Sequence, residues 1–188
     1  MLKHIAASIA LVFSIGAAQA SDSEKLKIIG DEKSIIVETD DGPVEITRVM
    51  TACAKNKGFL QPLIPAEGVN PATEIEVLNA LKDPAYTVVD MRTVEWRIKG
   101  TIPGSIHIPY TEVADRLDEL GCEKADGNFD CAKAKKVVGF CNGPVCPQSP
   151  MAMRAMIREG YPAEKIFYYR GGMLDWDALG LTTVEGMF

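Results

Sequence analysis

Histidine and closely spaced cysteine pairs are scarce in this chain of 188 residues. It contains two histidines, His4 and His107, and no Cys-x-x-Cys pair. Zinc sites in proteins are usually built from such residues at short spacings. The sequence therefore predicts no zinc site.

Long apolar runs are also missing beyond the first twenty residues. The one long run, residues 5–17, follows Lys3 and is closed by Ala18-Gln19-Ala20. It is too short to span a membrane comfortably, and its three-part pattern is typical of a secretory signal peptide cleaved after Ala20. An uncleaved anchor is the alternative. We expect residues 1–20 to direct export to the periplasm, without stable membrane insertion.

An excess of basic charge is absent. The chain has 20 Lys and Arg residues against 26 Asp and Glu, which gives a net charge of −6. Cleavage of the signal peptide would remove Lys3 and make the net charge more negative. Nucleic acid is therefore not an expected partner, because its binding relies on basic patches. A site for an anion must be made locally, by backbone amides, a helix end or a nearby arginine.

Five cysteines are present, and export places them in an oxidising compartment. Because their number is odd, at least one lacks an intramolecular partner. Cys122 and Cys131 enclose a polar, turn-rich segment, which predicts a local disulfide between them. The partner of Cys53 stays open, and the remaining two are Cys141 and Cys146.

Three segments follow the signal peptide. Residues 21–50 predict a β-hairpin extension, because alternating hydrophobic runs flank the turn sequence Asp40-Asp41-Gly42. A loose leader is the alternative for this segment. Residues 51–71 carry scattered proline and glycine without periodicity, which predicts a linker. Residues 72–185 form the main domain.

Helical and strand patterns alternate through the main domain. A helix capped at Asn70, or at Thr73 with Glu76, carries apolar residues on one face, namely Ile75, Leu78 and Leu81. Further helices are expected to start at Thr93, Thr111 and Ser149-Pro150, and strands to cover residues 86–89, 106–109, 135–140 and 165–169. Such alternation indicates an α/β fold, a parallel sheet flanked by helices on both faces.

One loop joins a strand end to a helix start and carries two thiols. Its residues are Cys141, Asn142, Gly143, Pro144, Val145, Cys146, Pro147, Gln148 and Ser149. Ser149 followed by Pro150 is typical of an N-cap and a first helical position. A thiol at the positive end of a helix is stabilised as the thiolate, the form that acts as nucleophile. In parallel sheets, functional groups gather at the carboxyl ends of strands, where Cys141 falls.

Three separated motifs, within residues 73–181, resemble those of the rhodanese family of sulfurtransferase domains. The strand 88–92 ends in Asp-x-Arg, residues 100–109 read Gly-Thr-Ile-Pro-Gly-Ser-Ile-His-Ile-Pro, and residues 169–172 read Tyr-Arg-Gly-Gly, with Trp176 shortly after. Their order and spacing make the combination specific. With the Cys-Asn-Gly-Pro loop, the chain resembles an exported bacterial subgroup that has a β-rich leader.

The resemblance implies a rhodanese-like sheet and a function for Cys141. As the family's nucleophile, Cys141 would take the outer sulfur of a small anion such as thiosulfate and become a persulfide. The sulfur would then pass to cyanide or to an acceptor thiol, which an exported partner protein could supply. This two-step covalent catalysis requires no cofactor. Asp90 is expected to organise the site, Arg92 to pair with Asp90 or Glu95, and His107 to pack at a strand edge.

The loop departs from the family pattern Cys-x-x-Gly-x-Arg-Ser/Thr. It is longer, it contains Pro144 and Pro147, which lack amide donors, and it has no arginine before Ser149. An arginine that binds an anion must then reach in from outside the loop. The candidates are Arg92, Arg154 and Arg170. The missing loop arginine also disfavours the phosphatase variants of this fold.

Cys146 opens two alternatives to sulfur transfer. As a resolving thiol it would form a disulfide with Cys141, which would make the protein a thiol redox protein. Without such a role, Cys146 would be a structural partner for Cys53 or a plain buried thiol. The second alternative is a non-enzymatic Cu(I)-binding module in which nearby methionines join the two cysteines. These methionines are Met151, Met153 and Met156, for which core packing is the simpler explanation.

Overall fold

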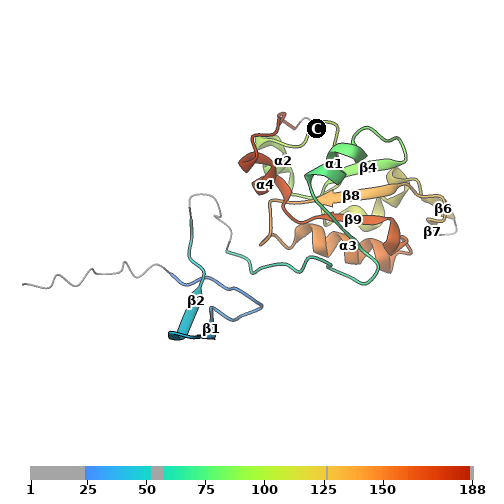
Figure 1. The fold of residues 1–188 in the computed structure, drawn as a ribbon. Helices are drawn as coiled ribbons and strands as arrows, with labels where there is room; N and C mark the ends of the chain where they lie inside the picture. The colour runs from blue at the N-terminus through green and yellow to red at the C-terminus, as the bar shows by residue number, and fades with distance from the viewer. Residues whose placement is uncertain (1–23, 52–56, 126, 187–188) are drawn as a thin grey trace, which may run out of the picture.

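The computed structural model describes residues 24–51, 57–125 and 127–186. The expected signal peptide, residues 1–20, and Cys53 lie outside the described residues. At the centre is a five-stranded sheet whose neighbouring strands are all parallel (Figure 1). Its strand order is β3 (Asn70–Ala72), β9 (Ile166–Tyr169), β8 (Lys136–Phe140), β4 (Tyr86–Asp90) and β5 (Ile106–His107). The predicted α/β fold is confirmed.

Helices cover both faces of the sheet and bury two hydrophobic cores. One face carries α1 (Glu74–Ala80) and α4 (Gly172–Ala178), and the other carries α3 (Gln148–Arg158) with the 3₁₀ helices η1 (Val113–Asp115) and η2 (Leu117–Leu120). Alternate residues of β8 supply the two cores, since Val137 belongs to the α3 side and Val138 to the α1 side. Two further short helices are α2 (Val94–Lys99) and η3 (Ala163–Lys165).

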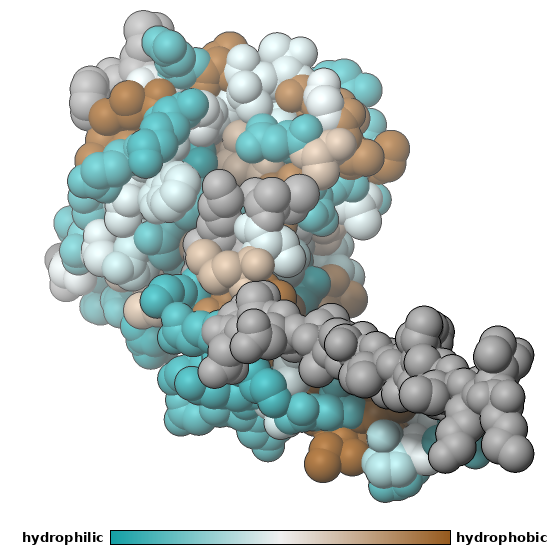
Figure 2. All heavy atoms as spheres, turned by 90° about the vertical axis from the view of Figure 1, so that its left-hand side faces the viewer, coloured by the Kyte–Doolittle hydropathy of each residue, from teal (hydrophilic) through white to brown (hydrophobic). Residues whose placement is uncertain are grey.

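Two hairpins lie outside this sheet. The N-terminal one pairs β1 (Ser34–Thr39) with β2 (Gly42–Thr47) through the predicted two-residue turn at Asp40-Asp41. It retains exposed apolar side chains at Ile36, Val37, Val44 and Ile46, and brown surface is visible on the lower part of the molecule in Figure 2. The second pairs β6 (Glu123–Ala125) with β7 (Asn128–Asp130), and the structure joins its flanking residues Cys122 and Cys131 by a disulfide.

Several element boundaries and faces follow the sequence pattern. Thr73 is the N-cap of α1, and its amide and hydroxyl both donate to the Glu76 carboxylate at 2.7 Å, which completes a capping box. Thr93 and Gly100 bound α2, and Gly160 follows the end of α3 in a left-handed conformation.

Other expectations are wrong in detail. The face of α1 that packs on the sheet carries Val77 and Ala80, while Ile75 is 63% exposed and Leu78 37%. The packing of α1 against β4 and β3 sets this face. The last two residues of the expected linker, 70 and 71, belong with Ala72 to the edge strand β3, which the proline and the lack of periodicity concealed.

The two remaining corrections concern helix starts. The segment after Thr111 forms η1 and η2 in place of an α-helix, although Val113, Leu117 and Leu120 are all buried as their spacing indicated. Helix α3 starts at Gln148 with Pro147 as its N-cap, because the Pro147 carbonyl already accepts the first hydrogen bond of the helix, from the Met151 amide at 2.9 Å. Ser149 is therefore inside the first turn and not the cap.

Among the described residues, no helix combines the length and apolar character needed to cross a membrane.

Candidate active site

Cys141 lies directly after β8, at the carboxyl edge of the sheet, and the start of α4 fixes its backbone. The Cys141 carbonyl accepts the Met173 amide and the Asn142 carbonyl accepts the Leu174 amide, both at 3.0 Å. Gly172 makes this approach possible, because it has a φ of +56° and a Cβ there would lie 2.2 Å from the Cys141 carbonyl oxygen. The Gly-Gly motif and the cysteine loop therefore form one contact.

The Cys141 thiol is buried, with 1% of the residue exposed, and polar groups surround it. In the protonated form it donates to the Cys146 carbonyl at 3.3 Å. Burial raises the pKa of Cys141, but the Cys146 thiol, the Ser149 hydroxyl and the amides of Ser149 and Gly143 outweigh this effect and lower the pKa to about 7. These donors form the cradle for a thiolate that the helix start suggested.

Cys146 is the second thiol of the same cradle, and both cysteines are free. Its hydrogen bond with Cys141 and its burial raise the pKa of Cys146. While Cys141 is protonated, the single S–H of Cys146 donates to the Gln148 side-chain oxygen at 3.6 Å. The pair therefore loses its first proton from Cys141, and Cys146 stays a neutral donor to it.

The two loop prolines do not remove the donors of this cradle. The amides that reach the Cys141 sulfur belong to Gly143 and Ser149. Pro144 and Pro147 instead serve as acceptors, because the Pro144 carbonyl accepts the Gln61 amide at 2.8 Å and the Pro147 carbonyl begins α3. Val145, between them, is buried.

Asp90 and Arg92 form a buried ion pair behind the loop. The Arg92 guanidinium donates to both Asp90 oxygens, at 2.9 and 2.6 Å, and the Asp90 carboxylate also accepts the Thr101 hydroxyl at 2.7 Å. Arg92 further donates to the Gly100 carbonyl at 2.7 Å and to the Asn142 side-chain oxygen at 3.3 Å. Arg92 thus holds the loop in place, and its guanidinium is occupied by these contacts.

This network contains residues that sequence reasoning did not single out. Arg97 lies 3.7 Å from Asp90 and donates to the Ser105 carbonyl at 3.0 Å. Burial and the charge of Arg92 lower the pKa of Arg97, against the opposing effect of Asp90. Thr101 and Ser105 could have been recognised from the sequence, because they are polar residues of the motif at 100–109. Arg97 could not, because a charged residue of a short helix is usually exposed to solvent.

The other candidate arginines differ in position. Arg154 is exposed on α3 and donates to the Pro65 carbonyl at 3.3 Å. Arg170 follows β9, beside the loop, and its Nε donates to the carbonyl of Gln61 at 2.7 Å. Gln61 bridges Arg170 and the Pro144 carbonyl through its backbone, so a linker residue forms part of the site. No sequence signal marked Gln61.

His107 is on β5, and its Nε2 donates to the Arg92 carbonyl at 2.9 Å. It therefore supports the site from a strand edge, through the backbone of Arg92. Among the residues that the structure describes, no group of three His, Cys, Asp or Glu could hold a metal ion. Met153 and Met156 are fully buried in the core, while Met151 is about half exposed, so the three methionines do not share one surface.

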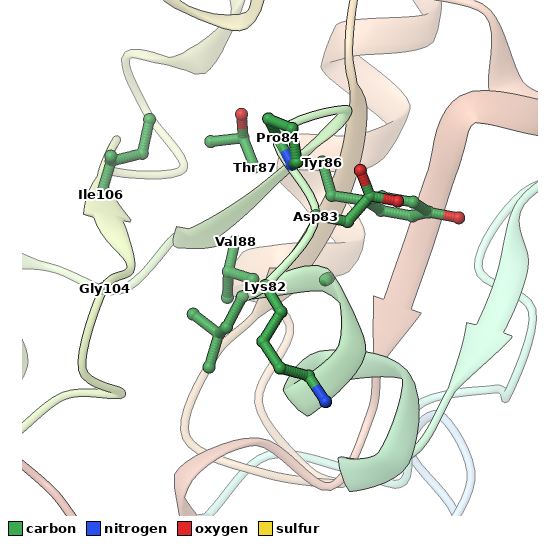
Figure 3. A pocket seen from close by; sticks show the side chains of 10 residues that line it. Lys82, Asp83, Pro84, Tyr86, Thr87, Val88, Gly104 and Ile106 are labelled. Carbon is green, nitrogen blue, oxygen red and sulfur yellow. The ribbon is translucent and has the colours of Figure 1, made fainter.

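A surface groove with a volume of about 410 Å³ lies elsewhere, against α1 and β4 (Figure 3). Its lining includes Lys82, Asp83, Tyr86, Thr87 and Ile106. No residue of the loop 141–149 lines it. The chemistry of the site therefore belongs to the Cys141 cradle and not to this groove.

Comparison with known proteins places these observations in context. The family model of the Rhodanese-like domain matches residues 73–179. An HTH-type transcriptional regulator of Mycobacterium tuberculosis, Rv0324, is 35% identical over 114 residues, which are 61% of this chain and 44% of that protein. A putative sulfur carrier protein of Bacillus subtilis, YrkF, is 31% identical over 94 residues, 50% of this chain and 43% of that protein. The chain thus spans less than half the length of these two relatives.

Solved structures share the fold. Thiosulfate sulfurtransferase from Pseudomonas aeruginosa superposes with a TM-score of 0.50 at 23% identity, over 66% of this chain and 22% of that chain. The BH2092 protein of Bacillus halodurans superposes with a TM-score of 0.50 at 20% identity, over 61% of this chain and 76% of that chain.

Proposed function

We propose that this chain, which belongs to the family of rhodanese-like domains, is an exported sulfurtransferase that carries sulfur as a persulfide on Cys141. One observation carries the proposal. Cys141 follows the strand β8 inside a cradle of donors that lowers its pKa to about 7, so the nucleophilic thiolate is populated at neutral pH.

The proposed reaction has two displacement steps. The Cys141 thiolate attacks the outer sulfur of thiosulfate, the sulfur–sulfur bond of thiosulfate breaks, and sulfite leaves with the bonding electron pair. An acceptor thiolate, or cyanide, then attacks the outer sulfur of the Cys141 persulfide. This step restores the Cys141 thiolate and releases a persulfide or thiocyanate. Sulfur transfer as the reaction class is supported by the names of two of these proteins, the thiosulfate sulfurtransferase of Pseudomonas aeruginosa and the putative sulfur carrier protein of Bacillus subtilis.

Arg170 is the side chain best placed to receive the anionic donor. It is partly exposed, it follows β9 at the carboxyl edge, and only its Nε forms a hydrogen bond with the described residues. Arg92 is less suited, because its contacts with Asp90, Gly100 and Asn142 occupy its guanidinium. We therefore expect Arg170→Gln to raise the KM for thiosulfate.

Sulfur loading followed by mass spectrometry tests the proposal. Wild-type protein incubated with thiosulfate should gain one sulfur atom on the Cys141 peptide, and Cys141→Ser should gain none. Cys146→Ser is the matched control, because it removes the other thiol of the same loop. Wild-type protein that stays unmodified with thiosulfate, and also with a small-molecule persulfide as donor, would contradict the proposal.

A second function is favoured by the two adjacent free thiols of the loop. In a redox cycle, the Cys141 thiolate would attack a disulfide of an exported partner, and Cys146 would then displace the partner's thiol. The partner gains two electrons and two protons, and the loop disulfide forms. Peptide mapping of the non-reduced protein across redox buffers tests this cycle, and free thiols in every buffer would exclude it.

A further inference from the structure

Two buried hydroxyls beside the candidate nucleophile lack a well-formed hydrogen bond. They belong to Ser149, in the first turn of α3, and to Tyr168, on β9, and both residues are fully buried. Among the buried side-chain nitrogen and oxygen atoms of the described residues, only Arg97 Nε shares this condition. Buried hydroxyls are normally paired, because leaving one unpaired in the interior is costly.

The positions of the two hydroxyls connect them to Cys141. Tyr168 pairs in the sheet with Gly139, two residues before Cys141, and it belongs to the core on the α3 side. Ser149 lowers the pKa of Cys141 and also that of Tyr168, so its hydroxyl lies near both groups, although its oxygen and the Tyr168 hydroxyl have no formed hydrogen bond in the structure. Burial raises the pKa of Tyr168, and negative charge on Cys141 raises it further, so Tyr168 remains a neutral donor.

We propose that Tyr168 is a positioning residue for Cys141 and acts through Ser149. When the Cys141 sulfur is neutral, it is a weak acceptor, and both hydroxyls stay poorly paired. When it carries negative charge, as thiolate or persulfide, it becomes a strong acceptor. The Ser149 hydroxyl then donates to the sulfur and accepts the Tyr168 hydroxyl, so that both orphaned groups are satisfied in the charged state.

Other groups around the sulfur contribute to the same charge balance. The Cys146 thiol donates from within the loop, Arg170 comes two residues after Tyr168 at the sheet edge, and Arg92 with Asp90 lies behind Asn142. None of these groups occupies the place of the Tyr168 hydroxyl. Its removal therefore leaves the Ser149 oxygen without its donor.

The inference rests on Cys141 as the reacting thiol of the proposed function, but its test requires no sulfur transfer. The alkylation rate of Cys141 by iodoacetamide, read from the Cys141 peptide by mass spectrometry as a function of pH, reports the midpoint at which the thiolate forms. We expect Ser149→Ala to raise this midpoint by about one pH unit and Tyr168→Phe by roughly half a unit. In the Ser149→Ala background, Tyr168→Phe should cause no further shift.

Tyr161→Phe is the matched control. Tyr161 is also buried, but its hydroxyl donates to the Lys135 carbonyl, and Tyr161 is absent from the groups acting on Cys141. Its loss should lower the melting temperature and leave the Cys141 midpoint unchanged, whereas Tyr168→Phe should leave the melting temperature unchanged.

Three results would overturn the inference. They are a wild-type midpoint in Tyr168→Phe, an equal shift with and without Ser149, and a loss of stability in Tyr168→Phe that matches that of Tyr161→Phe. Failure of the proposed function gives a different result, because wild-type Cys141 would then take up no sulfur while the alkylation midpoints still shift.

Discussion

The contact between Gly172 and the Cys141 carbonyl can be tested with one added methyl group. In Gly172→Ala, the new Cβ would lie 2.2 Å from the Cys141 carbonyl oxygen and 2.9 Å from the Gly143 amide nitrogen, both of them backbone atoms. The left-handed conformation costs a non-glycine residue about 1–2 kcal/mol. Displacing packed atoms costs about 1–3 kcal/mol more, so the free energy of unfolding should fall by about 2–5 kcal/mol.

Gly180→Ala separates these two contributions. Gly180 also has a positive φ, +70°, but a Cβ there would meet nothing within 4 Å. It should therefore show only the conformational cost. The difference between the two variants isolates the clash at Cys141 and should be about 1–3 kcal/mol, which corresponds to roughly 2–12 °C in melting temperature for a chain of this size.

Urea unfolding monitored by circular dichroism measures both variants, and Cys141 alkylation reports the local effect. Gly172→Ala should slow alkylation or shift its pH midpoint, because the displaced backbone carries the donors of the cradle. Gly180→Ala should leave the rate and the pH midpoint of Cys141 alkylation unchanged. Equal stability of the two variants, with unchanged alkylation, would refute the argument that Gly172 positions the cysteine loop.

Three further predictions concern charge and cross-linking. Arg92→Ala should lower the free energy of unfolding by about 3–5 kcal/mol, because it leaves the Asp90 carboxylate buried without its partner. An unchanged urea concentration at the unfolding midpoint would contradict this. Replacing Cys122 and Cys131 by serine should cost about 2–3 kcal/mol through the closed loop that they define, and reductant should destabilise only the parent protein. Since the pKa of Cys141 is lowered to about 7, its alkylation rate should rise with pH and level off above about 8, and a midpoint near the 8.5 of a free thiol would be inconsistent with the cradle.

Much of the fold was predictable because the relevant signals are local. The Thr73–Glu76 capping box, the glycine after α3 and the hydrophobic run of β8 each lie within a few residues, and each defines its own element. Helix α3 shows the limit of such signals. Ser149-Pro150 matches a helix start, but Pro147 satisfies the same backbone requirement two residues earlier.

The less predictable features depend on contacts that no local pattern contains. The edge strand β3 exists because β9 offers a free edge, and its sequence Asn-Pro-Ala has no strand pattern of its own. The exposed Ile75 shows the same dependence, since the position of α1 over the sheet selects Val77 and Ala80 for burial. Gln61 joins the site from a segment whose composition indicated only a linker.

The candidate site combines both kinds of information. Cys141 and the Gly-Gly pair match the sequence pattern of the family, whereas the extra loop length, the two prolines and the second cysteine depart from it. In the structure these departures leave the cradle intact, because the amides that reach the sulfur come from Gly143 and Ser149 and the added donor is the Cys146 thiol. The loop thus replaces the family's arginine with neutral donors. Neutral donors stabilise a thiolate without adding positive charge, so the proposed function needs a cation outside the loop to attract an anionic donor, and our candidate for it is Arg170.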